Sequence, residues 1–325
     1  MAPVGAAIVA LVYQLSPFVL PYISRTSAML LPWAALGWLL LLTMRSVRHG
    51  GWRYPALLAL VVCTVAGVNA TAFAVILPAP IIWVYMEWRA QRLPTRQVLM
   101  ASARISVLCI AVSVWWVAML SIQSKFGADV LAYSETLDSV AYTSNSVEVM
   151  RSLGYWLFYV RDPYAAATTS SIPYQESLLL IAVGFLLLVV CLLGLVVTRF
   201  AQRRYAITLV TVGLLLSVGV HPFDDPSPVA GALRSSGLAL ALRSSTRALP
   251  LVSLGLGLGA AALVTAVRYQ HRRRGTYLGI GVVLLIAANL PSLWTAHLVD
   301  TALERDQDPP QAWLDAAQAL DDGDT

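Results

Sequence analysis

The stretch that decides the fold is Ser177–Val197, SLLLIAVGFLLLVVCLLGLVV, which carries no charged residue over 21 positions. The hydrocarbon core of a bilayer is about 30 Å thick, and a helix of about 20 apolar residues crosses it. The segment therefore predicts a membrane-spanning helix. Arg199, Arg203 and Arg204 follow it, and positive charges beside a span favour the cytoplasmic side.

The composition of the whole chain points to the same class of protein. Its 325 residues are 58% hydrophobic and 12% charged, with a mean hydropathy of +0.71. Soluble globular proteins average about 45–50% apolar and about 25% charged residues. The formal net charge of +5 is gathered in short basic clusters between apolar segments, which reflects membrane topology rather than nucleic-acid binding. We therefore expect an all-α, polytopic transmembrane helical bundle in the plasma membrane, with membrane lipids around it and no nucleic-acid partner.

Working outward from Ser177–Val197, the apolar pattern predicts about nine spans. They are Pro3–Leu20, Ala28–Met44, a helical hairpin within Pro55–Trp88 with its tip near Gly67–Thr71, Val98–Gln123, Ser177–Val197, Tyr205–Val220, Ala248–Val267 and Thr276–Ala296. Every arginine cluster at a span end then falls on the cytoplasmic side, which is the internal argument for this assignment. Under this assignment, residues 1–296 form one transmembrane domain with an extracytoplasmic loop at 124–176. Residues 297–325 become the start of a truncated extracytoplasmic region.

Gly255-Leu-Gly-Leu-Gly259 has the look of a glycine-rich nucleotide loop, but it lies in mid-span with no strand before it. Small residues at this spacing let helices approach closely, so the motif predicts helix packing. The four histidines are scattered, and the three cysteines lie in apolar stretches without ligand spacing. The sequence therefore gives no reason to expect a metal, a cofactor or a disulfide framework.

Residues 221–247 form a segment that is neither a clean span nor a soluble loop. The segment begins with the acid pair Asp224 and Asp225, and ends with Arg243 and Arg247, four residues apart. If this part is helical, the two arginines share one face, and we expect their guanidinium groups to point toward lipid headgroups. Such a re-entrant or interfacial segment suits a site for an anionic, lipid-linked substrate. An ordinary amphipathic connector whose arginines meet lipid phosphates explains the same residues equally well.

The loop at 124–176 carries a second candidate region, Arg151–Pro163, RSLGYWLFYVRDP. It packs four aromatic residues into five positions and ends in the charged pair Arg161 and Asp162. Ring faces suit the C–H side of a sugar, and charged groups suit its hydroxyls and phosphate. The alternative is an aromatic belt at the membrane interface, where Trp and Tyr are enriched.

Six segments of the sequence, taken in their order along the chain, resemble a known family. They are YQLSPFVLPYISRTSAMLLPWAALGWLL, AGVNATAFAVILPAPIIW, SLGYWLFYVRDP, HPFDDPSPVAG, RSSTRALPLVSLGLGL and LERDQDPPQAWLDAAQALD. In this order they resemble the large actinobacterial α-(1→3)-arabinofuranosyltransferases, over nearly the whole chain. The resemblance implies a multi-span GT-C fold. It also implies transfer of arabinofuranose from decaprenyl-phospho-arabinose to the arabinan of arabinogalactan and lipoarabinomannan, in cell-wall biogenesis outside the plasma membrane.

The resemblance also implies that parts of the family pattern lie outside this chain. The family's first spans, and the first loop with the acidic residue expected to act as catalytic base, precede the matching segments. Carbohydrate-binding modules follow them. We therefore expect an internal membrane-core portion of such a transferase, without its base and possessing no metal site. A fragment, a split gene and a degenerate copy all remain open.

Transfer from a lipid phosphate needs a positively charged group beside the departing phosphate to stabilise it. Arginine suits this role because it binds phosphate oxygens in pairs. The residues expected to do so are Arg243 and Arg247, followed by Arg234 and Arg161. The carboxylates of Asp224, Asp225 and Asp162 are expected to orient those arginines or to contact sugar hydroxyls. Two alternative functions are open: a lipid-linked sugar transporter or flippase, and a structural membrane subunit. A transporter favours inverted repeats and charges near the midplane, and the sequence shows no repeat.

Overall fold

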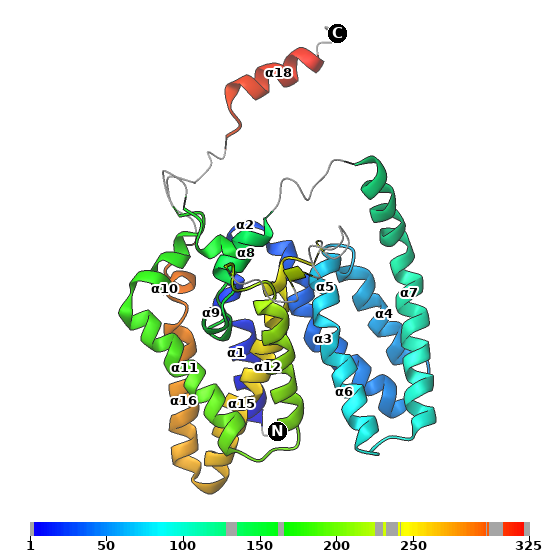
Figure 1. Ribbon diagram of the computed structural model, residues 1–325, viewed down its shortest axis with the longest axis vertical. Helices are drawn as coiled ribbons and strands as arrows, with labels where there is room; N and C mark the ends of the chain where they lie inside the picture. Colours follow the sequence, from blue (N-terminus) through cyan, green and yellow to red (C-terminus); the bar gives the residue numbers. More distant parts are fainter. Residues whose placement is uncertain are drawn as a thin grey trace.

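The computed structural model describes residues 3–127, 135–161, 166–224, 230–231, 240, 242–296, 298 and 308–321, without the side chains of residues 24 and 25. Within these ranges the regular elements are helices, and the β-structure is one isolated bridge between Arg161 and Ala166. The all-α prediction is confirmed. Figure 1 shows the long helices standing side by side, with short helices gathered at one end.

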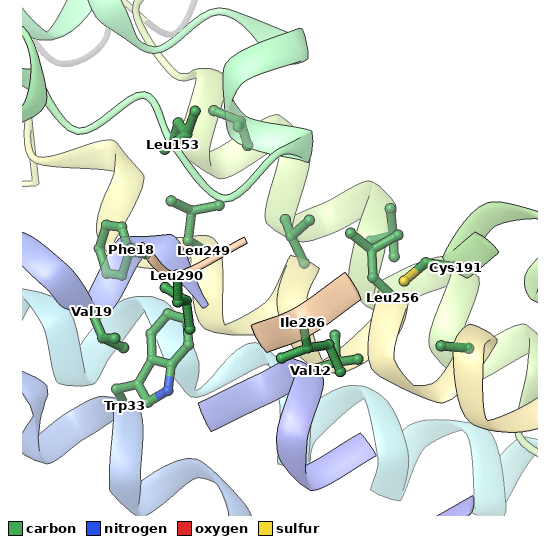
Figure 2. Close-up of a cluster of buried hydrophobic side chains, with 14 of the residues drawn as sticks. Val12, Phe18, Val19, Trp33, Leu153, Cys191, Leu249, Leu256, Ile286 and Leu290 are labelled. Carbon is green, nitrogen blue, oxygen red and sulfur yellow. The ribbon is translucent and has the colours of Figure 1, made fainter. Parts of the chain in front are cut away.

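The long helices form two groups. In the first, α15 (Leu249–Gln270) is surrounded by α1 (Pro3–Gln14), α11 (Leu178–Val197), α12 (Arg203–Val218) and α16 (Arg272–Ala288). The second contains α3 (Leu31–His49), α4 (Arg53–Val65), α5 (Ala70–Ile76), α6 (Pro78–Arg89) and α7 (Thr95–Phe126). Each group has its own apolar core. Figure 2 shows the first core where Phe18, Trp33, Leu249 and Leu290 meet.

Glycines let α11 and α15 touch through their backbones. A Cβ added to Gly194 of α11 would lie 1.9 Å from the carbonyl oxygen of Gly259, and one added to Gly259 would lie 2.3 Å from that of Cys191. Any side chain at these positions would overlap backbone atoms, which cannot rotate away. The prediction that Gly255–Gly259 serves close helix packing is confirmed. Of the three cysteines, Cys191 is buried between the helices and Cys63 is exposed.

Among the described residues, fewer than nine helices are long and apolar enough to span a membrane. Five helices in the described ranges can cross a membrane, and a sixth candidate is a pair bent by 40° at Ser16-Pro17. Helices also occupy the other expected positions, but α4, α12 and α16 have 13, 16 and 17 residues, short of the roughly 20 that a bilayer requires. In the expected hairpin, α4 ends at Val65 and Asn69 caps α5. The predicted tip is therefore confirmed.

The two ends of the bundle differ. The turns α6–α7, α11–α12 and α15–α16, which carry arginines, lie at the lower end in Figure 1. The upper end holds α2 (Leu20–Arg25) and the short helices that follow α7: α8 (Leu137–Thr143), α9 (Ser146–Met150) and α10 (Ile172–Glu176). The remaining helices are α17 (Pro291–Thr295) and α18 (Gln311–Asp321).

The segment with α8 and α9 is fastened to the end of α12. Ser144 Oγ donates to the carbonyl of Val218 at 3.1 Å, and His221 Nδ1 lies 2.8 Å from the carbonyl oxygen of Ala141. Val140 and Ala141 pack in a small apolar cluster with Val220. Trp156 and Phe223, one from each of the two regions singled out in the sequence, also pack against this cluster.

Candidate functional site

Arg243 and Arg247 turn inward rather than toward lipid headgroups. Arg243 comes before the 3-10 helix η6 (Ser245–Ala248), in which Arg247 lies, so the two do not share a helical face. Arg243 is only 6% exposed. Its Nε donates to the carbonyl oxygen of Glu135 at 2.6 Å, and a terminal nitrogen donates to that of Leu240 at 3.2 Å. The expected orientation is therefore wrong for Arg243, because its guanidinium group serves backbone carbonyls in the interior.

Arg247 joins the two groups of helices. One terminal nitrogen donates to Thr71 Oγ1 and lies 3.4 Å from Asn69 Oδ1, both at the start of α5. The other lies 3.6 Å from a carboxylate oxygen of Glu135. Its side chain is 16% exposed. Arg247 is thus a half-buried cation whose planar group keeps capacity for a further acceptor.

Glu135 is the functional candidate that the sequence did not reveal. Its side chain is 8% exposed, and its second carboxylate oxygen accepts from Trp156 Nε1 at 3.0 Å. Its carbonyl binds Arg243 and its carboxylate faces Arg247. A carboxylate with so little water around it requires such partners. In the sequence Glu135 is one acid among several in a long polar loop, and no spacing distinguishes it.

Aromatic rings form a wall beside this charged group. Tyr22 of α2 stacks on Tyr155 with 5.0 Å between ring centroids, and Phe18 stacks on Trp33 at 5.3 Å. Tyr155 also meets Trp156 edge-on at 5.9 Å. Tyr155 is buried, so this part of the aromatic run is not an exposed membrane belt. Burial, with Glu135 nearby, raises the pKa of Tyr155, and its phenol therefore stays protonated near neutral pH.

A small pocket lies between Arg247 and the rings. It is lined by Arg247, Pro250 and aromatic or apolar side chains, namely Phe18, Tyr22, Met29, Leu30, Pro32, Trp33, Ala72 and Ile76. The space in which a water molecule can be centred is about 20 Å³, which suits about one water. A sugar ring enters only if these side chains move apart.

Of the other predicted site residues, Arg161 and Asp224 are described by the structure, and neither joins this group. Arg161 forms an exposed ion pair with Glu176 at 2.8 Å. Asp224 is exposed and follows Phe223, whose ring stacks on Tyr142 at 4.2 Å. Asp162, Asp225 and Arg234 lie outside the described residues. The structure thus brings together Arg243 and Arg247 through Glu135 and places Arg161 with another partner.

A second ion pair lies within the same loop, and its arginine also contacts the first helix group. Arg151 lies 2.7 Å from Glu148, and Tyr159 donates its hydroxyl to the other carboxylate oxygen at 2.6 Å. The Arg151 guanidinium also lies 5.0 Å from the ring centroid of Phe185 in α11. Burial and the adjacent Glu148 raise the pKa of Tyr159. Both carboxylate oxygens of Glu148 are engaged, so this cluster holds structure rather than offering a binding site.

Comparison with known proteins places the arrangement in context. Residues 2–325 match the family described as alpha-(1->3)-arabinofuranosyltransferase, N-terminal GT-C domain. The chain is 27% identical over 346 aligned residues to the alpha-(1->3)-arabinofuranosyltransferase of Mycolicibacterium smegmatis, and 26% over 343 to that of Mycobacterium tuberculosis. These alignments cover 99% and 98% of this chain but 23% of each relative. The chain thus spans about a quarter of the length of the curated relatives it matches.

The fold also has a counterpart among solved structures. A single-particle cryo-EM structure of the arabinofuranosyltransferase AftD from mycobacteria superposes with a TM-score of 0.69 at 23% identity. The match covers 98% of this chain and 20% of that one. The helical arrangement described above is therefore shared with a multi-pass membrane protein.

Proposed function

Because this chain belongs to the family of N-terminal GT-C domains of α-(1→3)-arabinofuranosyltransferases, we propose that it binds decaprenyl-phospho-arabinose for transfer of arabinofuranose to cell-wall arabinan. The observation that carries this proposal is the convergence of Arg243 and Arg247 on Glu135 beside stacked aromatic rings. The charged group suits a sugar phosphate, and the rings suit the sugar.

Arg247 is the proposed phosphate ligand. Its 3.6 Å separation from the Glu135 carboxylate is too long for a good hydrogen bond, so a phosphate oxygen can take a place beside this guanidinium. A planar, permanently charged group binds two phosphate oxygens at once and stabilises the negative charge that develops as the sugar leaves. Arg243 positions the backbone at Glu135 through the hydrogen bond from its Nε to the Glu135 carbonyl oxygen. We assign the role of catalytic base to none of these residues.

The sugar is proposed to lie against Tyr22 and Tyr155. Their stacked rings offer apolar faces, and the protonated phenol of Tyr155 offers a donor for a sugar oxygen. Since the pocket has room for about one water, donor binding must be accompanied by movement of these rings. Arabinan, the proposed acceptor, would approach from the end of the bundle that holds α8 and α10.

The proposal is tested by comparing two lipids that differ in the phosphate. The purified chain in nanodiscs is expected to bind decaprenyl-phospho-arabinose at least about tenfold more tightly than decaprenol. Hydrogen bonds to charged groups contribute about 1.5–3 kcal/mol each, and decaprenol lacks the charge. The measurement is a titration by tryptophan fluorescence, with short-chain phosphatidylcholine as the control lipid. Equal affinity for the two polyprenyl lipids would contradict a phosphate site.

The proposed site faces the outside of the cell, which makes a prediction about topology. Reporter fusions after Arg48, Arg92, Arg203 and Arg273 are expected to behave as cytoplasmic, because basic clusters stay inside. Fusions at Asp138 and Asp315 are expected to behave as exported. Alkaline phosphatase and green fluorescent protein activities distinguish the two locations. An exported signal at Arg273 would reverse the orientation and exclude an external donor site.

A further inference from the structure

A long groove runs between α6 and α7 in the second helix group. α7 packs mainly along α4 and meets α6 at few points, and Figure 1 shows α7 at the edge of the molecule. The groove has a volume of about 670 Å³, within the roughly 300–1,000 Å³ of ordinary ligand pockets. Its lining is mostly apolar and comes from five helices, with Leu39 of α3, Val62 of α4, Phe73 of α5, Val84 of α6 and Trp116 of α7 among the residues that form it.

Small side chains on α7 create this space. Ser102, Ser106, Cys109 and Ser113 all line the groove, and their spacing of four, three and four residues puts them on one helical face. The α7 residues in the lining extend from Ser102 to Val117, which at 1.5 Å per residue is about 22 Å. The groove therefore follows most of the hydrocarbon thickness of a bilayer, about 30 Å. Its length and its apolar lining suit an aliphatic chain.

A basic hollow lies at the α6–α7 turn, close to the end of the groove at which Tyr85 and Ser102 stand. The hollow, about 640 Å³, is lined by Trp88, Arg89, Gln91, Arg92, Leu93, Pro94 and Thr95. Tyr85 lines the groove, Trp88 lines the hollow, and their ring centroids are 6.2 Å apart. Tyr and Trp are typical of the membrane–water boundary. An apolar groove, an aromatic boundary and two arginines thus follow one another in the order of a phospholipid's parts.

We propose that this groove binds one acyl chain of an anionic phospholipid whose phosphate lies in the hollow beside Arg89 and Arg92. Arg92 is already paired with Glu87 at 2.7 Å but remains 57% exposed, so it retains donors for an incoming phosphate. Two arginines against one acid leave a net positive hollow, which favours an anionic headgroup over a zwitterionic one.

The position of the hollow separates this lipid from the proposed donor. Asn69 and Thr71, which contact Arg247, stand at the start of the 20-residue stretch Ala70–Arg89 that ends at the hollow. Helical residues over that length span about 30 Å. One phosphate cannot occupy both places, so the phospholipid site does not depend on the proposed function.

The test measures lipid retention in the purified chain by native mass spectrometry after release from nanodiscs with equal phosphatidylglycerol and phosphatidylcholine. The wild-type chain is expected to retain phosphatidylglycerol preferentially. Ser106→Trp, which fills the groove, should lose most retained lipid of either headgroup, whereas Val107→Trp, at a neighbouring position that does not line the groove, should behave as wild type. The double variant Arg89→Gln/Arg92→Gln should lose the preference for phosphatidylglycerol by roughly tenfold. Arg199→Gln/Arg204→Gln, at another basic turn, is its control.

Cross-linking of the wild-type chain provides a second measurement that needs no variant to fold. Phosphatidylglycerol with a photoreactive group in its acyl chain should label peptides of α6 and α7 rather than α11. Equal retention by Ser106→Trp and Val107→Trp, or equal labelling of α11, would overturn the proposal. Displacement of the retained lipid by decaprenyl phosphate would assign the groove to a polyprenyl chain and would also overturn it.

Discussion

Arg247→Ala is expected to weaken binding of decaprenyl-phospho-arabinose by roughly ten- to a hundredfold, because charge-assisted hydrogen bonds contribute about 1.5–3 kcal/mol each. Arg247 is the arginine of the site that combines partial exposure with side-chain partners, Thr71, Asn69 and Glu135. Its removal leaves the Glu135 carboxylate with Trp156 as a donor and no compensating charge from Arg247. The phosphate would then face a negative group instead of a positive one.

Matched variants separate the charge of Arg247 from its shape. Arg247→Lys should recover only part of the affinity, since lysine keeps the charge and loses the planar fork. Arg268→Ala, in the last turn of α15, should bind as wild type because that turn lies at the opposite end of the helix. Arg243→Ala should instead lower stability, since its buried guanidinium supports two carbonyls. Wild-type binding by Arg247→Ala would show that the donor phosphate is held elsewhere.

Arg151→Ala is expected to lower the free energy of unfolding by about 3–5 kcal/mol, the usual cost of removing one partner from a buried ion pair. The Arg151 side chain is 6% exposed and that of Glu148 is 19% exposed, at 2.7 Å. Without Arg151, the Glu148 carboxylate keeps Tyr159 as a donor but remains a charge with little water around it. The measurement is reversible unfolding of the purified chain in mild detergent.

Arg161→Ala is the control for this effect. Its partner Glu176 lies at a similar distance, 2.8 Å, but both side chains are about half exposed or more. Exposed pairs contribute about 0–1 kcal/mol, so this variant should unfold close to wild type. The double variant Arg151→Met/Glu148→Gln should recover part of the loss, because no unpaired charge remains. A similar cost for Arg151→Ala and Arg161→Ala would mean that the Arg151 pair is not effectively buried.

The fold class could be predicted from the sequence because a membrane-spanning helix needs a long run of apolar residues, and such runs are visible in the sequence itself. Leu178–Val197 could hardly be anything but a span, and the glycines of α15 pack as expected. The number of spans could not be predicted in the same way. The end of α12 depends on Gly219, which adopts a φ of +48°, and the start of α5 depends on the Asn69 cap. Such local signals shorten a helix without changing its apolar character.

The candidate site was predicted only in part. Arg243 and Arg247 were identified from their charge in an apolar setting, and the aromatic run at 155–159 from its density. Glu135 was missed because its partners come from Trp156, Arg243 and Arg247. Contacts over such sequence separations follow from how loops fold back on the bundle, and no periodic pattern encodes them. The same holds for Thr71, whose hydroxyl meets Arg247 from the other helix group.

The backbone contact between Gly194 and Gly259 has a mechanical consequence. Two helices that touch through their backbones leave no space for a side chain between them, so a residue larger than glycine at either position must push α11 and α15 apart. α15 continues directly from η6, the 3-10 helix that carries Arg247. The glycine contact therefore helps to set the position of Arg247 relative to Asn69 and Thr71 at the start of α5, with which it forms hydrogen bonds.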